Sequence, residues 1–163
     1  MSIEIERKFL VVGDDWKNHV SGQFQLKQGY LQSAPERTVR IRTSNKEGFI
    51  TIKGKTEGIT RTEYEYPIPF SEALSLLALC ENTPIEKVRY LVSHGSLTWE
   101  VDVFEGLNSG LVLAEVELQH ENQEIDLPDW IGEEVSRDSR YYNSALSAHP
   151  FSTWKGTHRQ TTK

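Results

Sequence analysis

Residues 37–54 read RTVRIRTSNKEGFITIKG, and apolar and polar side chains alternate on both sides of a short polar segment. Successive side chains of a strand point to opposite faces, so each run has one apolar and one polar face. The segment 45–48, NKEG, carries residues typical of a tight turn. The stretch therefore predicts an antiparallel hairpin whose polar face presents Arg40 and Arg42.

The same alternation continues in both directions along the chain. It predicts eight strands, at residues 3–12, 23–32, 37–44, 48–54, 60–69, 85–93, 97–105 and 111–119. Most connections between them are short, which makes successive strands antiparallel neighbours and indicates a meander. Eight such strands can close on themselves, which removes the sheet edges. The predicted fold is mainly β with a few helices, and a closed eight-stranded antiparallel barrel is one arrangement that these strands can form.

Two helices are predicted between and after the strands. Residues 72–81, EALSLLALCE, are rich in leucine and follow Ser71, a residue type that caps helix N-termini. This helix is expected to pack against the outside of the sheet. Residues 137–147, RDSRYYNSALS, predict a C-terminal helix capped by Ser136 or Asp138.

The chain of 163 residues has the length of one domain. We assign residues 1–147 to that domain. Residues 148–163 contain no acidic residue and no periodic pattern, so a flexible C-terminal tail is expected. An apolar outer face covered by few helices also leaves room for a homodimer.

Charge and cysteine content exclude several classes of partner. The formal net charge is −6, which argues against nucleic acid and against an anionic membrane surface, because both select basic proteins. Cys80 is the only cysteine, so no intramolecular disulfide can form. The charged opening, MSIEIERKFL, leaves no room for the apolar part of a signal peptide. We therefore expect a cytoplasmic protein.

The polar faces of the predicted strands carry charges in pairs of like sign. The acidic residues on these faces are Glu4, Glu6, Glu63, Glu65, Glu100, Asp102, Glu115 and Glu117. The basic residues are Lys8, Arg40, Arg42, Lys53, Lys87 and Arg89. For any single strand, a solvated outer face explains such charges. Across the whole set, like charges side by side repel and require an opposite charge between them. If this face is the inside of the barrel, it lines a polar tunnel.

Both signs of charge in one tunnel predict a polyanion chelated to a metal ion. Clustered carboxylates without Cys or His are the oxygen ligands that suit Mg²⁺ or Mn²⁺. Arginine forks and lysine ammonium groups suit phosphate oxygens. A nucleotide or polyphosphate fits this description, and metal-assisted phosphoryl chemistry uses the same parts.

These strands resemble a known family. The opening IEIERKF, residues 3–9, contains a motif similar to ExExK of the CYTH superfamily, the triphosphate tunnel metalloenzymes. Further similar segments follow in the family's order: VRIR (39–42), TIKG (51–54), RTEYEY (61–66), EKVRY (86–90), WEVDVFEG (99–106), LAEVEL (113–118) and SRYYNSAL (139–146). The resemblance covers residues 1 to about 147 and is strongest to the small bacterial inorganic triphosphatases. It implies an eight-stranded antiparallel barrel that hydrolyses or cyclises triphosphates.

The resemblance also implies roles for individual residues. The implied metal ligands are Glu4, Glu6, Asp102, Glu115 and Glu117. The implied substrate-binding residues are Lys8, Arg40, Arg42, Lys53, Lys87, Arg89 and Arg140, with Arg137 as the alternative to Arg140. The residues expected to be catalytic are Lys8, Glu4, Glu6 and Glu117. Ion-pair scaffolding of the wall is expected of Glu63, Glu65 and Glu100, and is an alternative role for Lys87.

The predicted function is hydrolysis of a triphosphate that depends on Mg²⁺ or Mn²⁺. Inorganic tripolyphosphate is the first choice of substrate, because the short chain shows no added segment for base recognition. Thiamine triphosphatase, nucleoside triphosphatase and class IV-type adenylate cyclase are alternatives within the family. A non-catalytic polyphosphate or nucleotide sensor and a β-sandwich interaction module are alternatives of other classes. The two carboxylate pairs favour catalysis, because a pure anion binder gains nothing from them.

Overall fold

The computed structural model describes residues 1–154. Its strands are β1 (Ser2–Val11), β2 (Val20–Gln32), β3 (Arg37–Ser44), β4 (Glu47–Gly54), β5 (Thr60–Ile68), β6 (Glu81–His94), β7 (Leu97–Phe104), β8 (Val112–Glu117) and β9 (Ile131–Glu134). Its helices are α1 (Phe70–Leu77), α2 (Asn143–Ala148) and the 3₁₀ helices η1 (Asp15–His19), η2 (Gly106–Asn108), η3 (Ser139–Tyr141) and η4 (Phe151–Thr153). The eight predicted strands are all present, each within a few residues of its expected bounds.

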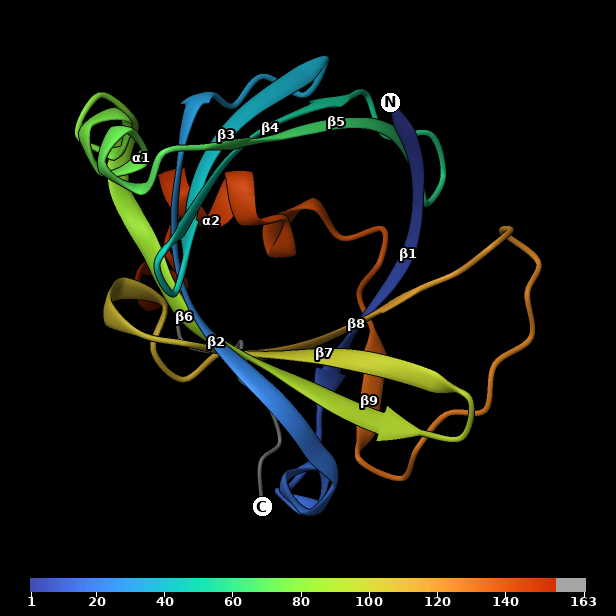
Figure 1. The fold of residues 1–163 in the computed structure, drawn as a ribbon. Helices are drawn as coiled ribbons and strands as arrows, with labels where there is room; N and C mark the ends of the chain where they lie inside the picture. Colours follow the sequence, from blue (N-terminus) through green and yellow to red (C-terminus); the bar gives the residue numbers. More distant parts are fainter. Residues whose placement is uncertain (155–163) are drawn as a thin grey trace.

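Strands β1 to β8 form the predicted closed antiparallel barrel, seen along its interior in Figure 1. The order around the barrel is β1-β5-β4-β3-β2-β6-β7-β8, and β8 returns to β1. The meander is correct from β2 to β5 and from β6 to β8. It is wrong for β1, which pairs with β5 and β8 instead of β2, and β2 pairs with β6.

Strand β1 pairs with three other strands. Residues 2–5 pair with β5, and residues 6–10 pair with β8 on the opposite edge. Strand β9 pairs with the C-terminal end of β1, past the residues that pair with β5, and Val11 lies opposite Ile131. The sequence analysis missed β9, because the four residues IGEE carry no alternation of apolar and polar side chains.

The inside of the barrel is apolar at one end and charged at the other. On β1 the inward positions change from charged to apolar between Lys8 and Leu10, and on β8 the same change occurs between Glu115 and Leu113. The apolar end is a buried cluster of Leu10, Ile85, Phe104, Leu111, Leu113, Val135, Tyr141 and Leu146. Because η3 and α2 supply Tyr141 and Leu146, the C-terminal segment closes this end, and α2 lies across the ring of strands in Figure 1.

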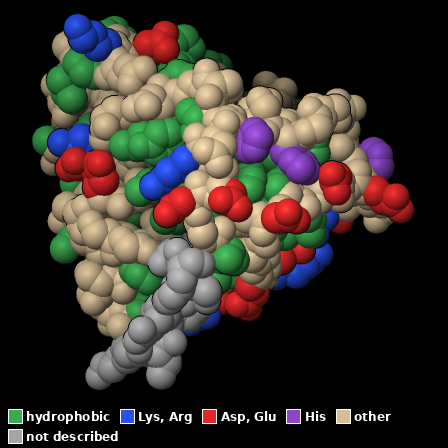
Figure 2. Space-filling view, turned by 90° about the horizontal axis from the view of Figure 1, so that it is seen from below, with side chains coloured by type: hydrophobic (Ala, Val, Ile, Leu, Met, Phe, Trp, Pro, Cys, Tyr) green, Lys and Arg blue, Asp and Glu red, His purple; other side chains and the backbone are tan. Residues whose placement is uncertain are grey.

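The outward face packs beneath the connecting segments. Phe9, Trp99 and Trp130 belong to one buried cluster outside β1, β7 and β8, and the Phe9 and Trp99 rings meet edge to face at 5.6 Å. On the other side of the barrel, α1 covers Ile41 on β3 (Figure 1). Space-filling Figure 2 shows acidic and basic side chains interspersed on the face seen from below, without a basic patch.

Helix α1 begins earlier and ends earlier than the predicted 72–81. Its N-cap is Pro69, whose carbonyl accepts from the amides of Glu72 and Ala73, so the prediction of Ser71 as N-cap is wrong. The chain must turn after Leu77 to bring Glu81 opposite Tyr30 in the sheet. Pairing of β6 therefore stops the helix, although its sequence continues in helix-forming residues.

The predicted helix 137–147 is divided into η3 and α2 by Tyr142, which is extended. Asp138 caps η3, as one of the two predicted caps, by accepting from the amide of Arg140 at 3.1 Å. Phe151 and Trp154, which fall in the predicted tail, pack against the buried cluster at the closed end of the barrel. The rest of that tail, 155–163, lies outside the described residues. Within residues 1–154, no helix is long and apolar enough to span a bilayer.

Candidate active site

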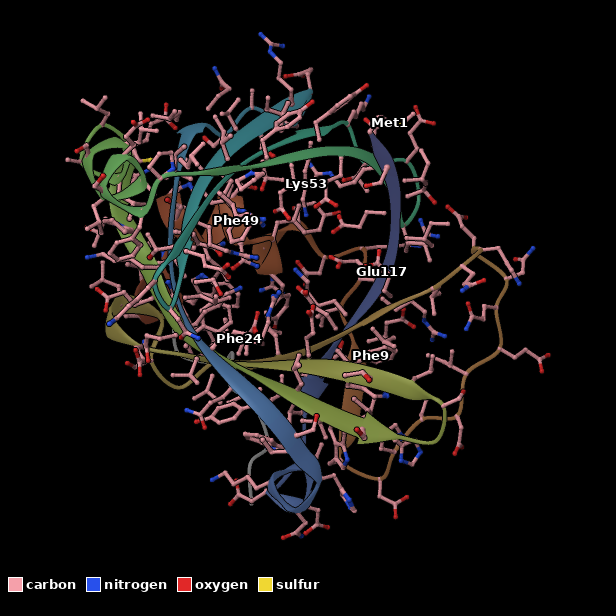
Figure 3. The ribbon with its side chains drawn as sticks, in the orientation of Figure 1. Met1, Phe9, Phe24, Phe49, Lys53 and Glu117 are labelled. Carbon is pink, nitrogen blue, oxygen red and sulfur yellow. The ribbon has the colours of Figure 1, made fainter. Side chains whose placement is uncertain are left out.

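The charged end of the barrel contains a cavity of about 310 Å³. Figure 3 shows Lys53 and Glu117 inside the ring of strands. The predicted site residues that line the cavity are Glu4, Glu6, Lys8, Arg40, Arg42, Lys53, Lys87, Arg89, Glu115 and Glu117. The predicted wall residues Glu63, Glu65 and Glu100 also line it. The interpretation of a solvated outer face is therefore wrong, because these charges face inward.

Carboxylates lie directly opposite one another where β1 meets β8. Glu6 pairs across the strands with Glu117, and Glu100 on β7 pairs with Glu115. Burial, together with Glu115 and Glu4, raises the pKa of Glu6 to about 8. Burial and the charges of Glu4, Glu63 and Glu100 raise the pKa of Glu117 to about 7. Opposed carboxylates with raised pKa values require a proton or a metal ion between them.

Lys53 on β4 reaches across the barrel to β1. Its Nζ donates to both oxygens of Glu4, at 2.9 and 3.0 Å, and lies 3.7 Å from Glu63. Within residues 1–154, no three Asp, Glu, His or Cys side chains are gathered for a metal ion. Glu4 is held by Lys53 instead. Carboxylates are the ligand type that divalent cations prefer, and Glu4, Glu6 and Glu117 bring three of them to the cavity wall.

Asp102 lies beneath the closed end of the cavity and is almost completely buried. Arg89 forms a two-pronged pair with this carboxylate at 2.8 and 2.9 Å, and Lys87 Nζ lies 2.7 Å from it. Burial alone would raise the pKa of Asp102, but Arg89 and Lys87 outweigh burial and hold it well below its usual range. Asp102 is therefore an ionised anchor for two cations.

Lys8 is held between β8 and the C-terminal segment. Its Nζ lies 3.3 Å from Glu115 and donates to the carbonyl of Tyr141 at 3.1 Å. Burial opposes ionisation of Glu115, but Lys8 and Arg89 lower its pKa to about 2. Glu115 is thus ionised, in contrast to Glu6 on the neighbouring strand.

The two arginines of β3 differ in their partners. Arg40 donates to Thr51 at 3.1 Å and to Glu65 at 3.3 Å, while its buried Nε has no hydrogen-bond partner in the described chain. Arg42 donates through Nε and Nη2 to Gln28 at 2.9 and 2.7 Å, and pairs with no carboxylate of residues 1–154. Burial, Arg40 and Arg89 lower the pKa of Arg42 to about 9. Guanidinium groups in this state suit an anionic ligand.

Two predicted site residues do not reach the cavity. Asp102 lies beneath Lys87 and Arg89 and is not part of the lining. Arg140 is on η3, where it pairs with Asp138 at 2.6 Å and stacks over the Trp154 ring at 5.2 Å. Closure of Arg140 over the substrate stays a prediction, since in this structure its guanidinium group pairs with Asp138 and does not line the cavity. Arg137 does not line the cavity either.

Sequence reasoning missed several polar lining residues. Arg61 on β5 lines the cavity and donates to the carbonyl of Gly54 at 3.1 Å. Its position two residues before the Glu63 and Glu65 doublet was the available signal. Others that line the cavity are Thr38, Ser136, Tyr142, Asn143 and Ser144. Thr38 lies two residues before Arg40 in a predicted strand, so the alternation offered a signal for it. The others gave no such signal, because Ser136 and residues 142–144 come from segments without strand alternation.

A closed antiparallel barrel with carboxylates facing cations across an internal cavity defines a class of protein whose binding site lies inside the barrel. The sequence matches the CYTH domain over residues 2–149. The chain belongs to the CYTH domain family.

Relatives of known name are similar along nearly their whole length. An inorganic triphosphatase of Acetivibrio thermocellus is 47% identical over 156 residues, which are 95% of this chain and 99% of that protein. One of Nitrosomonas europaea is 40% identical over 150 residues, 88% of this chain and 96% of the relative. A crystal structure of an inorganic triphosphatase has a TM-score of 0.64 and 37% identity, and the match covers 90% of this chain and 95% of that one.

Proposed function

We propose that this protein is a triphosphatase that uses a divalent metal ion to hydrolyse inorganic tripolyphosphate inside the barrel. The observation that carries the proposal is the division of the cavity wall: opposed carboxylates on β1 and β8 face cations on β3 and β4. A barrel that only bound polyanions would be weakened by Glu6 opposite Glu117. The names of the similar proteins support the same activity.

The cations of the wall would bind and orient the substrate. Arg40 and Arg42 present guanidinium groups to the cavity, and Arg42 has no carboxylate to neutralise it within the described chain. Lys8 and Lys53 would contact further phosphate oxygens, the latter on turning away from Glu4. Four cations on three strands can hold several phosphates in line, which places the terminal phosphorus at a fixed position.

Glu4, Glu6 and Glu117 would hold Mg²⁺ or Mn²⁺, and Glu115 lies beside them on β8. The donor set fits, because all ligands are carboxylates and two of them have raised pKa values that a cation would relieve. A divalent ion bound there would neutralise phosphate charge and favour ionisation of a water molecule. The chain itself supplies a cavity closed at one end, which limits the access of competing water.

Phosphate release from tripolyphosphate, ATP and thiamine triphosphate tests this function, each with Mg²⁺, with Mn²⁺ and with a chelator. We expect release from tripolyphosphate only with a metal ion. Release from ATP or thiamine triphosphate at a higher kcat/KM would reassign the substrate. Metal-independent binding of tripolyphosphate without any release would favour a sensor and overturn the enzyme.

We also propose that the protein works in the cytoplasm, binds neither nucleic acid nor membrane, and can form a homodimer. The single cysteine and the net charge of −6 support the first two points. The exposed apolar side chains Ile52, Tyr64 and Tyr66 on the outside of β4 and β5 support the third. Sedimentation of the purified protein tests the oligomeric state.

A further inference from the structure

Two uncharged amides, Gln28 and Asn143, lie between the cations of the site. Gln28 on β2 is completely buried, and its Oε1 accepts from Nε and Nη2 of Arg42 at 2.9 and 2.7 Å. Its Nε2 donates to Oδ1 of Asn143 at 3.2 Å and to the Tyr30 hydroxyl at 3.3 Å. The same Oδ1 of Asn143 accepts from Lys87 Nζ at 2.8 Å. A continuous chain of hydrogen bonds therefore joins Arg42 to Lys87.

The direction of this chain is fixed by the chemistry of its ends. Guanidinium and ammonium groups only donate hydrogen bonds, so each must meet an amide oxygen. Gln28 turns its oxygen to Arg42 and is left with its NH₂ group for Asn143. Oδ1 of Asn143 then accepts hydrogen bonds from both Gln28 Nε2 and Lys87 Nζ. Neither amide can reverse without placing two donors against each other.

Arg42 differs from the other cations in what neutralises it. Arg89 lies within 3.4 Å of Asp102, Glu100 and Glu115, whereas the partner of Arg42 is an amide. A glutamate in place of Gln28 has nearly the same shape and would pair its negative charge with Arg42. Its second oxygen would also face Oδ1 of Asn143, which now accepts from Gln28 Nε2. The Gln28 amide orients the guanidinium group of Arg42 and does not neutralise its positive charge.

Asn143 extends the same arrangement to the C-terminal segment. It is the first residue of α2, and both Asn143 and Tyr142 line the cavity. Lys8 donates to the Tyr141 carbonyl, and Lys87 donates to Asn143. Two lysines of the site are therefore oriented by residues that the strand pattern does not include.

We propose that Gln28 and Asn143 are positioning residues that orient Arg42 and Lys87 toward the triphosphate while leaving Arg42 unneutralised. The inference rests on the proposed function and adds to it. It predicts that a negative charge at position 28 weakens triphosphate binding in the folded protein.

The test is Gln28→Glu, with Gln23→Glu as the matched control, because Gln23 is an exposed glutamine on the same strand. Steady-state rates of phosphate release with Mg²⁺ or Mn²⁺ give kcat and KM for tripolyphosphate. We expect KM to rise by about tenfold or more in Gln28→Glu with a much smaller change in kcat, because a charged contact is lost from binding. The midpoint of thermal unfolding without ligand is measured for each variant, so that kcat and KM are compared for folded protein, and Gln23→Glu should match the wild type in both respects.

A second readout does not depend on catalysis. With chelator present, tripolyphosphate should raise the midpoint of thermal unfolding of the wild type and of Gln23→Glu, and this shift should be reduced in Gln28→Glu. A KM within twofold of wild type in folded Gln28→Glu would overturn the inference. A wild type that releases no phosphate but shows the ligand shift would overturn the proposed enzyme while leaving the positioning of Arg42 testable by binding.

Asn143→Leu provides an independent variant, and decides the question if Gln28→Glu does not fold. Leucine has a volume similar to that of asparagine but lacks the Oδ1 that accepts from both Gln28 and Lys87. The kcat/KM for tripolyphosphate should therefore fall by about tenfold or more. Asn108→Leu is its matched control for loss of a buried amide, since Asn108 bonds the amide of Phe151 away from the cavity. The control should lose stability and keep kcat/KM per folded molecule. Equal kcat/KM values in the two variants would contradict a positioning role.

Discussion

At the scale of single residues, the site combines carboxylates that are ionised with others that tend to be protonated. Glu115 is ionised because Lys8 and Arg89 stabilise its charge, whereas Glu6 and Glu117 lack a cation that could do so fully. A proton or a cation beside Glu6 and Glu117 would therefore relieve their unfavourable charge. Each of the three is one of two glutamates separated by a single residue on a strand, so the local sequence does not explain the difference. Strand register explains it, because register decides which charged side chains lie near each glutamate.

Replacement of the two β1 glutamates, Glu4→Gln with Glu6→Gln, should reduce phosphate release by about 100-fold or more. Both are proposed metal ligands, and a metal ion contributes several kcal/mol to phosphoryl transfer. The double variant Glu36→Gln with Glu47→Gln removes the same charge from exposed positions and should retain full activity. Unchanged release in the first double variant would show that the metal is held elsewhere.

The stability of the metal-free protein should depend on pH through Glu6 and Glu117. Their pKa values are raised to about 8 and about 7 in the folded chain, against 4.5 for a free glutamate. The folded state therefore binds more protons than the unfolded state between about pH 4.5 and 8, so this contribution to stability is lost as pH rises through that window.

Thermal unfolding at pH 6 and pH 8.5, with chelator and with Mg²⁺, measures the effect. The metal-free midpoint should fall between these two pH values, and Mg²⁺ should restore more at pH 8.5 than at pH 6. The variant Glu6→Gln should flatten the metal-free dependence. A chelated wild type whose midpoint does not change over the window would contradict the raised pKa values.

At the scale of elements, α1 is attached to the barrel by a close approach between two small residues. A Cβ added to Gly48 on β4 would lie 2.7 Å from the Cβ of Ala73 and 3.0 Å from the carbonyl of Ile68. Neither neighbour can rotate away, because one is a methyl group on the helix and the other is backbone. The sheet and the helix therefore meet at a distance that only glycine permits.

Gly48→Ala should lower the free energy of unfolding by about 1–3 kcal/mol, as overpacking of a close contact does. Gly22→Ala on β2 is the control, since its Cβ would meet only Leu91 at an ordinary 3.6 Å. Urea unfolding of both variants gives the comparison. A loss in Gly22→Ala as large as that in Gly48→Ala would point to the strand conformation of glycine instead of the helix contact.

Sequence predicted the elements that alternate and missed those that do not. Period two identified all eight barrel strands and placed Glu4, Arg40 and Lys53 on the polar faces, and the structure shows that these faces point inward. The alternation could not show which cation pairs with which carboxylate. Lys53 lies near Glu4 because β4 pairs with β5 and β5 pairs with β1, and these pairings are not visible in the local pattern. Asn143 lies in a segment whose position is set by tertiary packing, so its place in the site was not predictable from local pattern.

At the scale of the whole molecule, the closed end of the barrel depends on residues close to the end of the described chain. Phe151 and Trp154 pack against the buried cluster that contains Tyr141 and Leu146, and their rings meet at 5.0 Å. The same cluster supports the segment from which Tyr141 and Asn143 contact Lys8 and Lys87. Stability of the apolar end and geometry of the charged end are therefore linked.

Truncation after Ala148 should lower the free energy of unfolding by about 2 kcal/mol, because two partly buried aromatic side chains are lost. Truncation after Trp154 is the matched control, since it keeps both rings. Urea unfolding measures the difference between the two chains. Equal stability of the two would show that Phe151 and Trp154 contribute little to the cluster.

The pairing of β1 has a consequence for the order in which the protein can be completed during synthesis. This strand is translated before its partners β5, β8 and β9, the last of which ends at Glu134. The β1 strand must therefore wait without its partner strands until the residues up to Glu134 are made. The charges of Glu4, Glu6, Arg7 and Lys8 would protect such a strand from aggregation, because charged side chains oppose edge-to-edge pairing. Glu4, Glu6 and Lys8, which line the cavity of the folded protein, would thus also oppose aggregation before the barrel closes.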